Sequence, residues 1–277
     1  MHIAGRILLA AIFCAAFNPL PALAQRNATP LSGALVVTGS TTLLPVITEL
    51  AASFQARHHG VRIDVRGGGS GRGMSDVLAG SADIGMMSRA LRPEEKVASF
   101  AVARDGVCLV VHRDNPVNML NREQARGIFT GRIVNWKSVG GRDEPIELVT
   151  RGTERGASAL LTEFLGLDYA AFRARREVGD NLEIIPEISK SPAALAYVSL
   201  GLAQSSERAG AAIKRLAVQG VDATSASLRS GDSPLSRPLI LVTRETPRGL
   251  ARAFIEFALS RQAAAVIVKN DFIPYPD

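Results

Sequence analysis

Between residues 34 and 88 the chain alternates short apolar runs with segments of helical periodicity. The apolar runs occupy 34–40, 61–66 and 82–87, and each is followed by glycine, serine or threonine. Strand, helix, strand, helix, strand at this spacing predicts a parallel α/β unit with right-handed crossovers. In such a unit the carboxyl ends of the strands and the N-termini of the helices meet at one edge of the sheet.

The predicted helices of this unit have defined ends. Leu43, Ile47, Leu50 and Phe54 are spaced four, three and four residues apart, which places them on one helical face. Pro45 is tolerated because it falls in the first turn. We expect Gly60 to end this helix, and Gly80 to close a second, short helix over 73–80.

The rest of the chain predicts a second lobe. We expect strands at 106–111, 145–151 and 194–201, a helix through Phe129 capped by Asn121, and a helix over 157–166. A last strand and two helices follow residue 237, with Leu250, Phe254 and Phe257 on one face. Segments near 108–112 and 239–243 can cross between lobes. These crossings predict one lobe from 25–110 with 241–277, and another from 111–240.

The N-terminus has the pattern of an export signal. Arg6 precedes an apolar run over 7–17, and Ala22-Leu23-Ala24 provides a cleavage site, so the mature chain is expected to begin at Gln25. The alternative, a membrane anchor, needs about 20 apolar residues. Cys108 then remains as the single cysteine, which excludes an internal disulfide and favours a small buried apolar role.

Composition narrows the possible partners. The formal net charge is +6, which suits an anionic ligand, a nucleic acid or an anionic membrane surface. The basic cluster 173–177 is more typical of a solvated helix face than of a nucleic-acid site. The histidines and carboxylates show neither metal-ligand nor nucleophile spacing. We therefore expect no enzyme activity, no cofactor, no metal and no nucleic-acid binding.

Three turns in the first lobe carry candidate binding groups. They are Gly39 with Ser40, Thr41 and Thr42; Gly69 with Ser70 and Gly71; and Ser88 with Arg89. Helix N-termini offer unpaired N–H groups and about half a positive charge, so anions bind there. Serine and threonine also cap helices without any ligand. Three such turns in consecutive units nevertheless favour convergence on one small oxyanion.

Two further features support an anion site. Gly67, Gly68 and Gly69 permit positive φ and close approach of the backbone to a ligand, although a plain tight turn is the alternative. The motif lacks the lysine of a P-loop, which disfavours nucleotides. Arg151, at the end of a second-lobe strand, can hold an oxyanion with two parallel hydrogen bonds, or alternatively form a surface salt bridge.

At these loops the chain resembles the periplasmic phosphate-binding proteins of phosphate ABC importers. The resemblance spans nearly the whole mature chain, through GSTTLLPV, GGGSGRGMSDVLAGSADIGMMSRAL, DGVCLVVHRDNPV, IFTGRIVNWKSVGG, YVSLG, RPLILVTRETPRGLARAFIEFALS and FIPY. It implies a two-lobed type II periplasmic-binding-protein fold with a ligand cleft between the lobes. It also implies ligand contacts at Thr41, Thr42 and Ser70, and places Arg151 on the family's second-lobe arginine.

Two departures from the family pattern concern selectivity. Ser88 replaces an aspartate that accepts a hydrogen bond from protonated phosphate, and Arg155-Gly156-Ala157 replaces Ser-Gly-Thr. A site richer in donors should reject sulfate less strongly. The resemblance therefore implies a monomeric periplasmic receptor that delivers phosphate to a permease. A receptor or sensor for sulfate, molybdate or arsenate is the alternative, and an exported phosphatase is a more distant one. Convergence of Thr41, Ser70, Ser88 and Arg151 on one cleft discriminates among these hypotheses.

Overall fold

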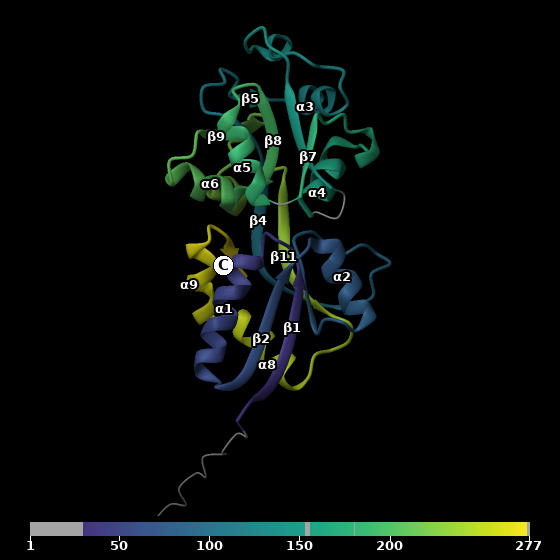
Figure 1. Ribbon diagram of the computed structural model, residues 1–277, viewed down its shortest axis with the longest axis vertical. Helices are drawn as coiled ribbons and strands as arrows, with labels where there is room; N and C mark the ends of the chain where they lie inside the picture. Colours follow the sequence, from purple (N-terminus) through teal and green to yellow (C-terminus); the bar gives the residue numbers. More distant parts are fainter. Residues whose placement is uncertain (1–29, 153–155, 180, 276–277) are drawn as a thin grey trace, which may run out of the picture. The chain divides into compact units, whose positions relative to one another are not determined.

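One mixed sheet runs through the described part of the computed structural model, residues 30–152, 156–179 and 181–275 (Figure 1). Its path is β2-β1-β3-β11-β4-β8-β6-β7, and β9 and β12 also pair with β4. The strands are β1 (Ser32–Gly39), β2 (Gly60–Gly67), β3 (Ile84–Met87), β4 (Ala98–His112), β5 (Met119–Leu120), β6 (Glu147–Arg151), β7 (Arg176–Val178), β8 (Ala194–Ser199), β9 (Ile213–Arg215), β10 (Ala217–Val218), β11 (Ser236–Thr243) and β12 (Ile273–Pro274).

Helices cover both faces of this sheet. They are α1 (Leu44–Arg57), α2 (Ser70–Ala79), α3 (Arg122–Phe129), α4 (Gly156–Leu165), α5 (Asn181–Lys190), α6 (Leu200–Arg208), α7 (Ser225–Ser230), α8 (Gly249–Ala258) and α9 (Arg261–Lys269). The predicted cap of α3 is confirmed, because Asn121 and Gln124 form a reciprocal capping box. None of the helices in this part of the chain is long and apolar enough to cross a membrane. The predicted signal segment, 1–24, lies outside the described residues.

The predicted parallel unit is confirmed. β1 pairs in parallel with β2 and with β3. α1, α8 and α9 pack on one face of these strands, while α2 lies on the other (Figure 1). β11 serves both faces, since Leu239 and Leu241 belong to the core under α1, whereas Ile240 and Val242 pack with α2. This group of elements is called the first lobe below.

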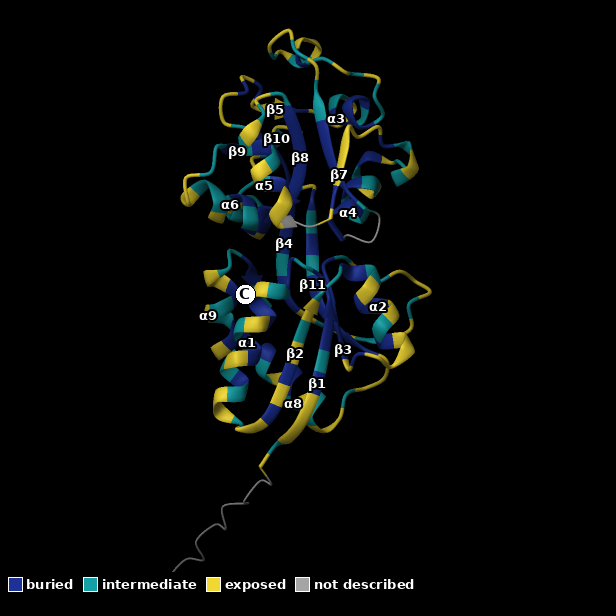
Figure 2. Ribbon diagram, in the orientation of Figure 1, coloured by how far each residue is buried: buried dark blue, intermediate teal, exposed yellow. Residues whose placement is uncertain are grey.

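The second lobe is built around β8, β6 and the far end of β4. Residues 98–106 of β4 pair with β11, and residues 107–111 pair with β8, so one continuous strand joins both lobes. Figure 2 shows β4 and β8 dark with burial along this path. Cys108 is buried here, as expected, and burial raises the pKa of its thiol. The packing is therefore continuous through the strand that links the lobes.

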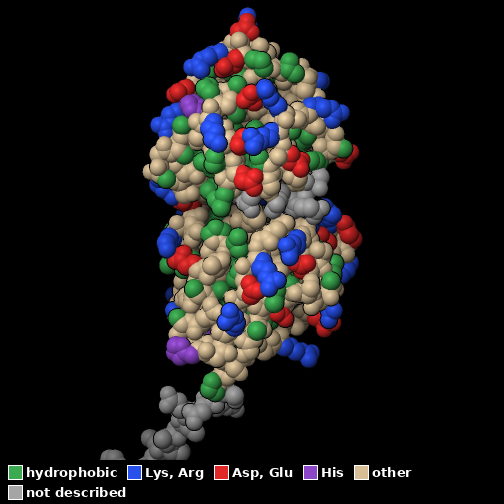
Figure 3. Space-filling model, in the orientation of Figure 1, with side chains coloured by type: hydrophobic (Ala, Val, Ile, Leu, Met, Phe, Trp, Pro, Cys, Tyr) green, Lys and Arg blue, Asp and Glu red, His purple; other side chains and the backbone are tan. Residues whose placement is uncertain are grey.

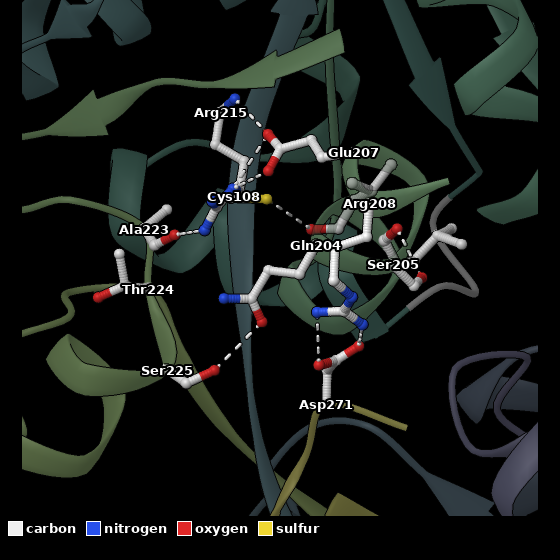
Figure 4. Close-up of polar contacts among 12 residues, drawn as sticks. Cys108, Gln204, Ser205, Glu207, Arg208, Arg215, Ala223, Thr224, Ser225 and Asp271 are labelled. Atoms are coloured by element: carbon white, nitrogen blue, oxygen red, sulfur yellow. Dashed lines mark hydrogen bonds and ion pairs between the residues drawn. The ribbon is translucent and has the colours of Figure 1, made fainter. Parts of the chain in front are cut away.

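The C-terminal segment forms another link between the lobes. Phe272 belongs to the first-lobe core, whereas the next residue, Ile273, packs into a second-lobe cluster. Figure 4 shows Arg208 of α6 paired through both terminal nitrogens with Asp271. The same view shows Glu207 holding Arg215. The polypeptide thus crosses between the lobes along β4 and before β11, while the C-terminal segment contacts both lobes.

Three sequence expectations need correction. α1 ends at Arg57 because β2 already begins at Gly60, so this glycine starts a strand instead of ending the helix. β4 begins at Ala98, well before residue 106, because its first half pairs with β11. The basic cluster 173–177 is exposed, as expected, but it lies in a loop and in β7 rather than on a helix.

Candidate functional site

The turn after β1 is organised by the Ser40 side chain. The Ser40 hydroxyl oxygen accepts hydrogen bonds from the backbone N–H groups of Thr42 and Leu43, at 3.2 and 3.4 Å. Its backbone N–H donates to the Met86 carbonyl at 2.8 Å. Ser40 therefore orders the turn that leads into α1, whose N-cap residue, Leu43, has no side-chain cap. Thr41 and Thr42 follow it at the head of the helix.

The turn after β2 joins the turn after β3 through two serines. Gly69 precedes α2 with φ of 95°, a left-handed conformation that favours glycine. Ser70, the first residue of α2, accepts a hydrogen bond from the Ser88 backbone N–H at 3.0 Å. The two hydroxyl oxygens lie 3.4 Å apart, and both side chains are buried. The glycine turn thus brings the N-terminus of α2 against Ser88.

Arg151 ends β6 in the second lobe and is 2% exposed. Its guanidinium carbon lies 5.3 Å from the centre of the Tyr197 ring, a cation–π contact. The Arg151 carbonyl accepts from the hydroxyls of Tyr197 and Ser158, at 3.3 and 3.2 Å. Burial raises the pKa of Tyr197, so the phenol stays neutral beside Arg151. Arg151 is buried and fixed rather than a surface salt-bridge residue.

These groups converge on one small cavity. Its volume is about 10 Å³, near the least that holds one water molecule. The lining residues come from both lobes: Ser40, Thr41, Thr42, Gly69, Ser70, Ser88, Arg151, Gly156 and Ala157. The discriminating set of Thr41, Ser70, Ser88 and Arg151 is therefore brought together.

Gly156 carries the second lobe into contact with the first. It is the first residue of α4, and a Cβ atom built on it would lie 2.5 Å from both the carbonyl and the hydroxyl oxygen of Ser88. No real side chain fits at that distance. α4 therefore presents bare backbone at its N-terminus, as the chain does at Gly69, the N-cap residue of α2. With α1, three helices begin at or within a few residues of this cavity, each adding partial positive charge.

Two predicted residues of the described chain are not brought into this lining. Gly71 lies one residue further into α2, behind Ser70. Arg89 turns to Glu95, with its two terminal nitrogens 2.7 and 2.5 Å from the carboxylate oxygens, and lowers the pKa of that carboxyl. Arg155 lies outside the described residues. Because Gly71 and Arg89 do not line the cavity, its described wall consists of hydroxyl groups, Arg151 and backbone.

Sequence reasoning missed Arg237 and Asp105, which lie directly behind the cavity. Arg237 of β11 is 2% exposed and pairs in register with Asp105 of β4, which is fully buried. Its Nε and Nη2 atoms lie 3.0 and 2.6 Å from Asp105 Oδ2. Nη2 also donates to Thr42 Oγ1, and Nη1 to Ser88 Oγ. A charged residue within each buried strand was the signal available in the sequence.

The wider electrostatics of the described residues fit an anion. Burial raises the pKa of Asp105, and the neighbouring Arg237 opposes that shift. No group of three or more histidine, cysteine, aspartate or glutamate side chains in the described segments is placed to hold a metal ion. Figure 3 shows basic and acidic side chains interspersed on the face it presents, with no large field of one sign. The positive charge that matters is local to the cavity.

Comparison with known proteins gives concordant relatives. The chain is 28% identical over 253 residues to the phosphate-binding protein PstS of Bacillus subtilis, which covers 89% of this chain and 82% of that protein. Its fold matches a substrate-binding protein assigned to a phosphate ABC transporter of Clostridium perfringens and solved with bound phosphate. That match has 28% identity, a TM-score of 0.81 and coverage of 87% and 99% of the two chains.

A second solved structure agrees with the first. An ABC-type phosphate transport receptor from Vibrio cholerae is 30% identical, with a TM-score of 0.74, and the match covers 86% of this chain and 99% of the receptor. The family model described as "PBP superfamily domain" matches residues 24–262, which is most of the sequence. The chain therefore belongs to the PBP superfamily, and its relatives there include the PstS-type phosphate-binding proteins.

Proposed function

We propose that this protein is a periplasmic receptor that captures inorganic phosphate between its two lobes and delivers it to the permease of an ABC importer. The observation that carries the proposal is the small cavity on which the N-terminal turns of three helices, several hydroxyls and Arg151 converge. Helix N-termini bind anions through backbone N–H groups, and a guanidinium adds charge-assisted hydrogen bonds. The names of the relatives support phosphate as the anion.

Capture would proceed by closure of one lobe on the other. The proposed lobes are 25–110 with 241–277, and 111–240, except that Arg237 and Leu239 of β11 pack with the first lobe. Closure would bring Arg151 and Gly156 onto an oxyanion already held by Thr41, Thr42 and Ser70. Because water leaves the site on closure, each donor then acts in a medium of lower dielectric. The binding energy of the ion would drive the lobes together.

The finer parts of this function are also proposals. The protein would be exported through cleavage before Gln25 and would act as a monomer, without enzyme activity and without binding nucleic acid. Ser40 would act by shaping the turn, while Ser88 would contact the ion. The contributions of Gly71, Arg89 and Arg155 as ligand contacts remain predictions from the sequence.

Calorimetry on ligand-stripped protein tests the proposed function. We expect phosphate to bind tightly at neutral pH with one site per chain. Arsenate, sulfate and molybdate titrated under the same conditions give the selectivity. Absence of phosphate heat, together with tight binding of another oxyanion, would identify a different receptor. Turnover of a chromogenic phosphate ester by pure protein, abolished by one substitution, would identify an enzyme.

A further inference from the structure

The guanidinium of Arg237 makes contacts that bear on ligand chemistry although it does not line the cavity. It reaches Asp105, Ser88 and Thr42 from within the sheet, and all of it is buried. A guanidinium has N–H donors and no acceptor at any pH found in a cell. Each of its contacts therefore occupies a lone pair of the partner oxygen. The hydroxyl oxygen of Ser88 is one of these partners.

Counting hydrogens at the two serines shows what remains for a ligand. Ser88 Oγ accepts from Arg237 Nη1 at 3.3 Å, and Ser70 Oγ accepts from the Ser88 backbone N–H at 3.0 Å. The two hydroxyls lie 3.4 Å apart, so one hydrogen at most can be shared between them. At least one hydroxyl hydrogen is then directed to the cavity that both residues line. Three of the four lone pairs of the two hydroxyls are then occupied, so the pair can donate once to a ligand and accept one ligand proton at most.

Asp105 fixes the Arg237 fork and is itself kept from the ligand. Its Oδ2 atom takes both Nε and Nη2 of Arg237, and neither residue lines the cavity. Among the described residues, the charged groups facing Ser88 and the cavity are Arg151 from β6 and Arg237 from β11, with Asp105 of β4 behind the latter. The lining itself contains no aspartate or glutamate within the described residues. The described lining supplies donors and offers no carboxylate to receive a ligand proton.

The geometry points to Arg237, positioned by Asp105, as the residue that makes Ser88 a donor and so selects the tetrahedral oxyanion form with the fewest protons. The inference rests on the proposed function and adds which protonation state of the ion binds. For phosphate that form is the dianion HPO₄²⁻. Its competitor H₂PO₄⁻ carries a second proton that would meet donors and has less charge to offer Arg151. Sulfate has no proton at neutral pH, and it should compete.

Calorimetry of the unmodified mature protein at several pH values tests this inference. If only the dianion binds, the apparent Kd for phosphate rises by about tenfold for each pH unit below the second ionisation of phosphate. Sulfate does not titrate there, so its Kd reports any titration of the protein itself. The ratio of the phosphate to the sulfate dissociation constant should therefore rise as the pH falls, because only phosphate changes its protonation state.

The outcomes separate this inference from the proposed function. A phosphate-to-sulfate ratio that stays constant with pH overturns the inference and leaves phosphate binding intact. Phosphate binding with complete rejection of sulfate overturns it as well, because a site built of donors cannot reject an unprotonated dianion. Absence of binding by either ion overturns the proposed function instead.

Substitution of the buried pair assigns the effect to Arg237. The double variant Arg237→Met/Asp105→Leu removes both charges and keeps the volume, which avoids a lone buried carboxylate. We expect the ratio of its phosphate and sulfate dissociation constants to vary severalfold less with pH than in the unmodified protein. The reason is that Ser88 regains the lone pair that Arg237 occupied. Arg237→Lys, which keeps the charge but lacks the fork, is the second variant and should shift the profile in the same direction. An unchanged profile in folded protein would refute the role of Arg237.

Discussion

Two arginine–carboxylate pairs flank the loop that carries Ser88, and they differ in side-chain exposure and in the sequence separation of their partners. Arg89 and Glu95 come from one loop and keep 12% and 10% of their side-chain surface exposed. Arg237 and Asp105 come from strands 132 residues apart and keep 1% and 0%. The first pair is a neighbour of Ser88 in sequence, and the second is a neighbour in space. The comparison teaches that adjacency along the chain is a poor guide to which cation governs a site.

The largest expected difference between the pairs is in stability. Arg237→Met leaves Asp105 buried without its ion-pair partner, which typically costs about 3–5 kcal/mol. Arg89→Met frees a carboxylate that can reach water, for which we expect about 1 kcal/mol or less. Urea unfolding of both variants measures the free energies. Equal losses would show that burial does not distinguish the pairs.

Ligand affinity should separate Arg151 from Arg89. Arg151→Ala removes a buried charge from the cavity wall, and we expect phosphate affinity to fall by at least about 30-fold, or 2 kcal/mol. Arg89→Ala should change affinity by less than about threefold, because its guanidinium is engaged by Glu95. Calorimetry with both variants provides the measurement. A larger loss in Arg89→Ala would restore this residue to the site.

Filling the close contact between the lobes at Ser88 should weaken phosphate affinity by an intermediate amount. In Gly156→Ala the new methyl group must displace Ser88, and overpacking of this kind costs about 1–3 kcal/mol. Phosphate affinity should weaken accordingly. Gly152→Ala is the matched control, since its Cβ would meet only Glu177 Oε1 at 3.5 Å. Similar affinities in the two variants would argue against the contact between Gly156 and Ser88 in the bound state.

The smallest expected effect is the pH dependence of the stability that the Arg89–Glu95 pair contributes. Arg89 holds the pKa of Glu95 below its ordinary value of 4.5. A carboxyl whose folded pKa is depressed contributes stability above its unfolded pKa, and that stability is lost as pH falls through the folded value. The stability difference between the wild type and Arg89→Met should therefore shrink on acidification from neutral pH. Chemical unfolding across that range checks the trend, and a growing difference would contradict it.

Much of the first lobe was predictable because its signals are local. The alternation of apolar runs and helical faces predicted β1, β2, β3, α1 and α2. Asp83, just before β3, links two of these strands, because its carboxylate accepts from the Val36 N–H at 2.8 Å. Seven predicted residues line the cavity: Ser40, Thr41, Thr42, Ser70, Ser88, Arg151 and Gly156. They were found because the ends of consecutive parallel strands share one edge of a sheet.

Features that depend on distant pairing were missed. The first half of β4 was not expected as a strand, since it is stabilised by β11 from the far end of the chain. α5 was also missed, because Pro186 lies inside it and Ile184 and Ile188 secure it only through the second-lobe core. Proline removes a helical hydrogen bond, so local propensity argued against that helix.

The sequence by itself determined the α/β class, the glycine and hydroxyl turns, and the family resemblance, because these depend on periodicity and on short motifs. Only the tertiary structure decided that Arg89 turns to Glu95 while Arg237 reaches Ser88 and Thr42. The physical reason is the antiparallel register of β4 and β11, which places Asp105 opposite Arg237 in the buried interior of the sheet. A buried guanidinium must satisfy its donors on the oxygens within reach, and those belong to the loops of the site.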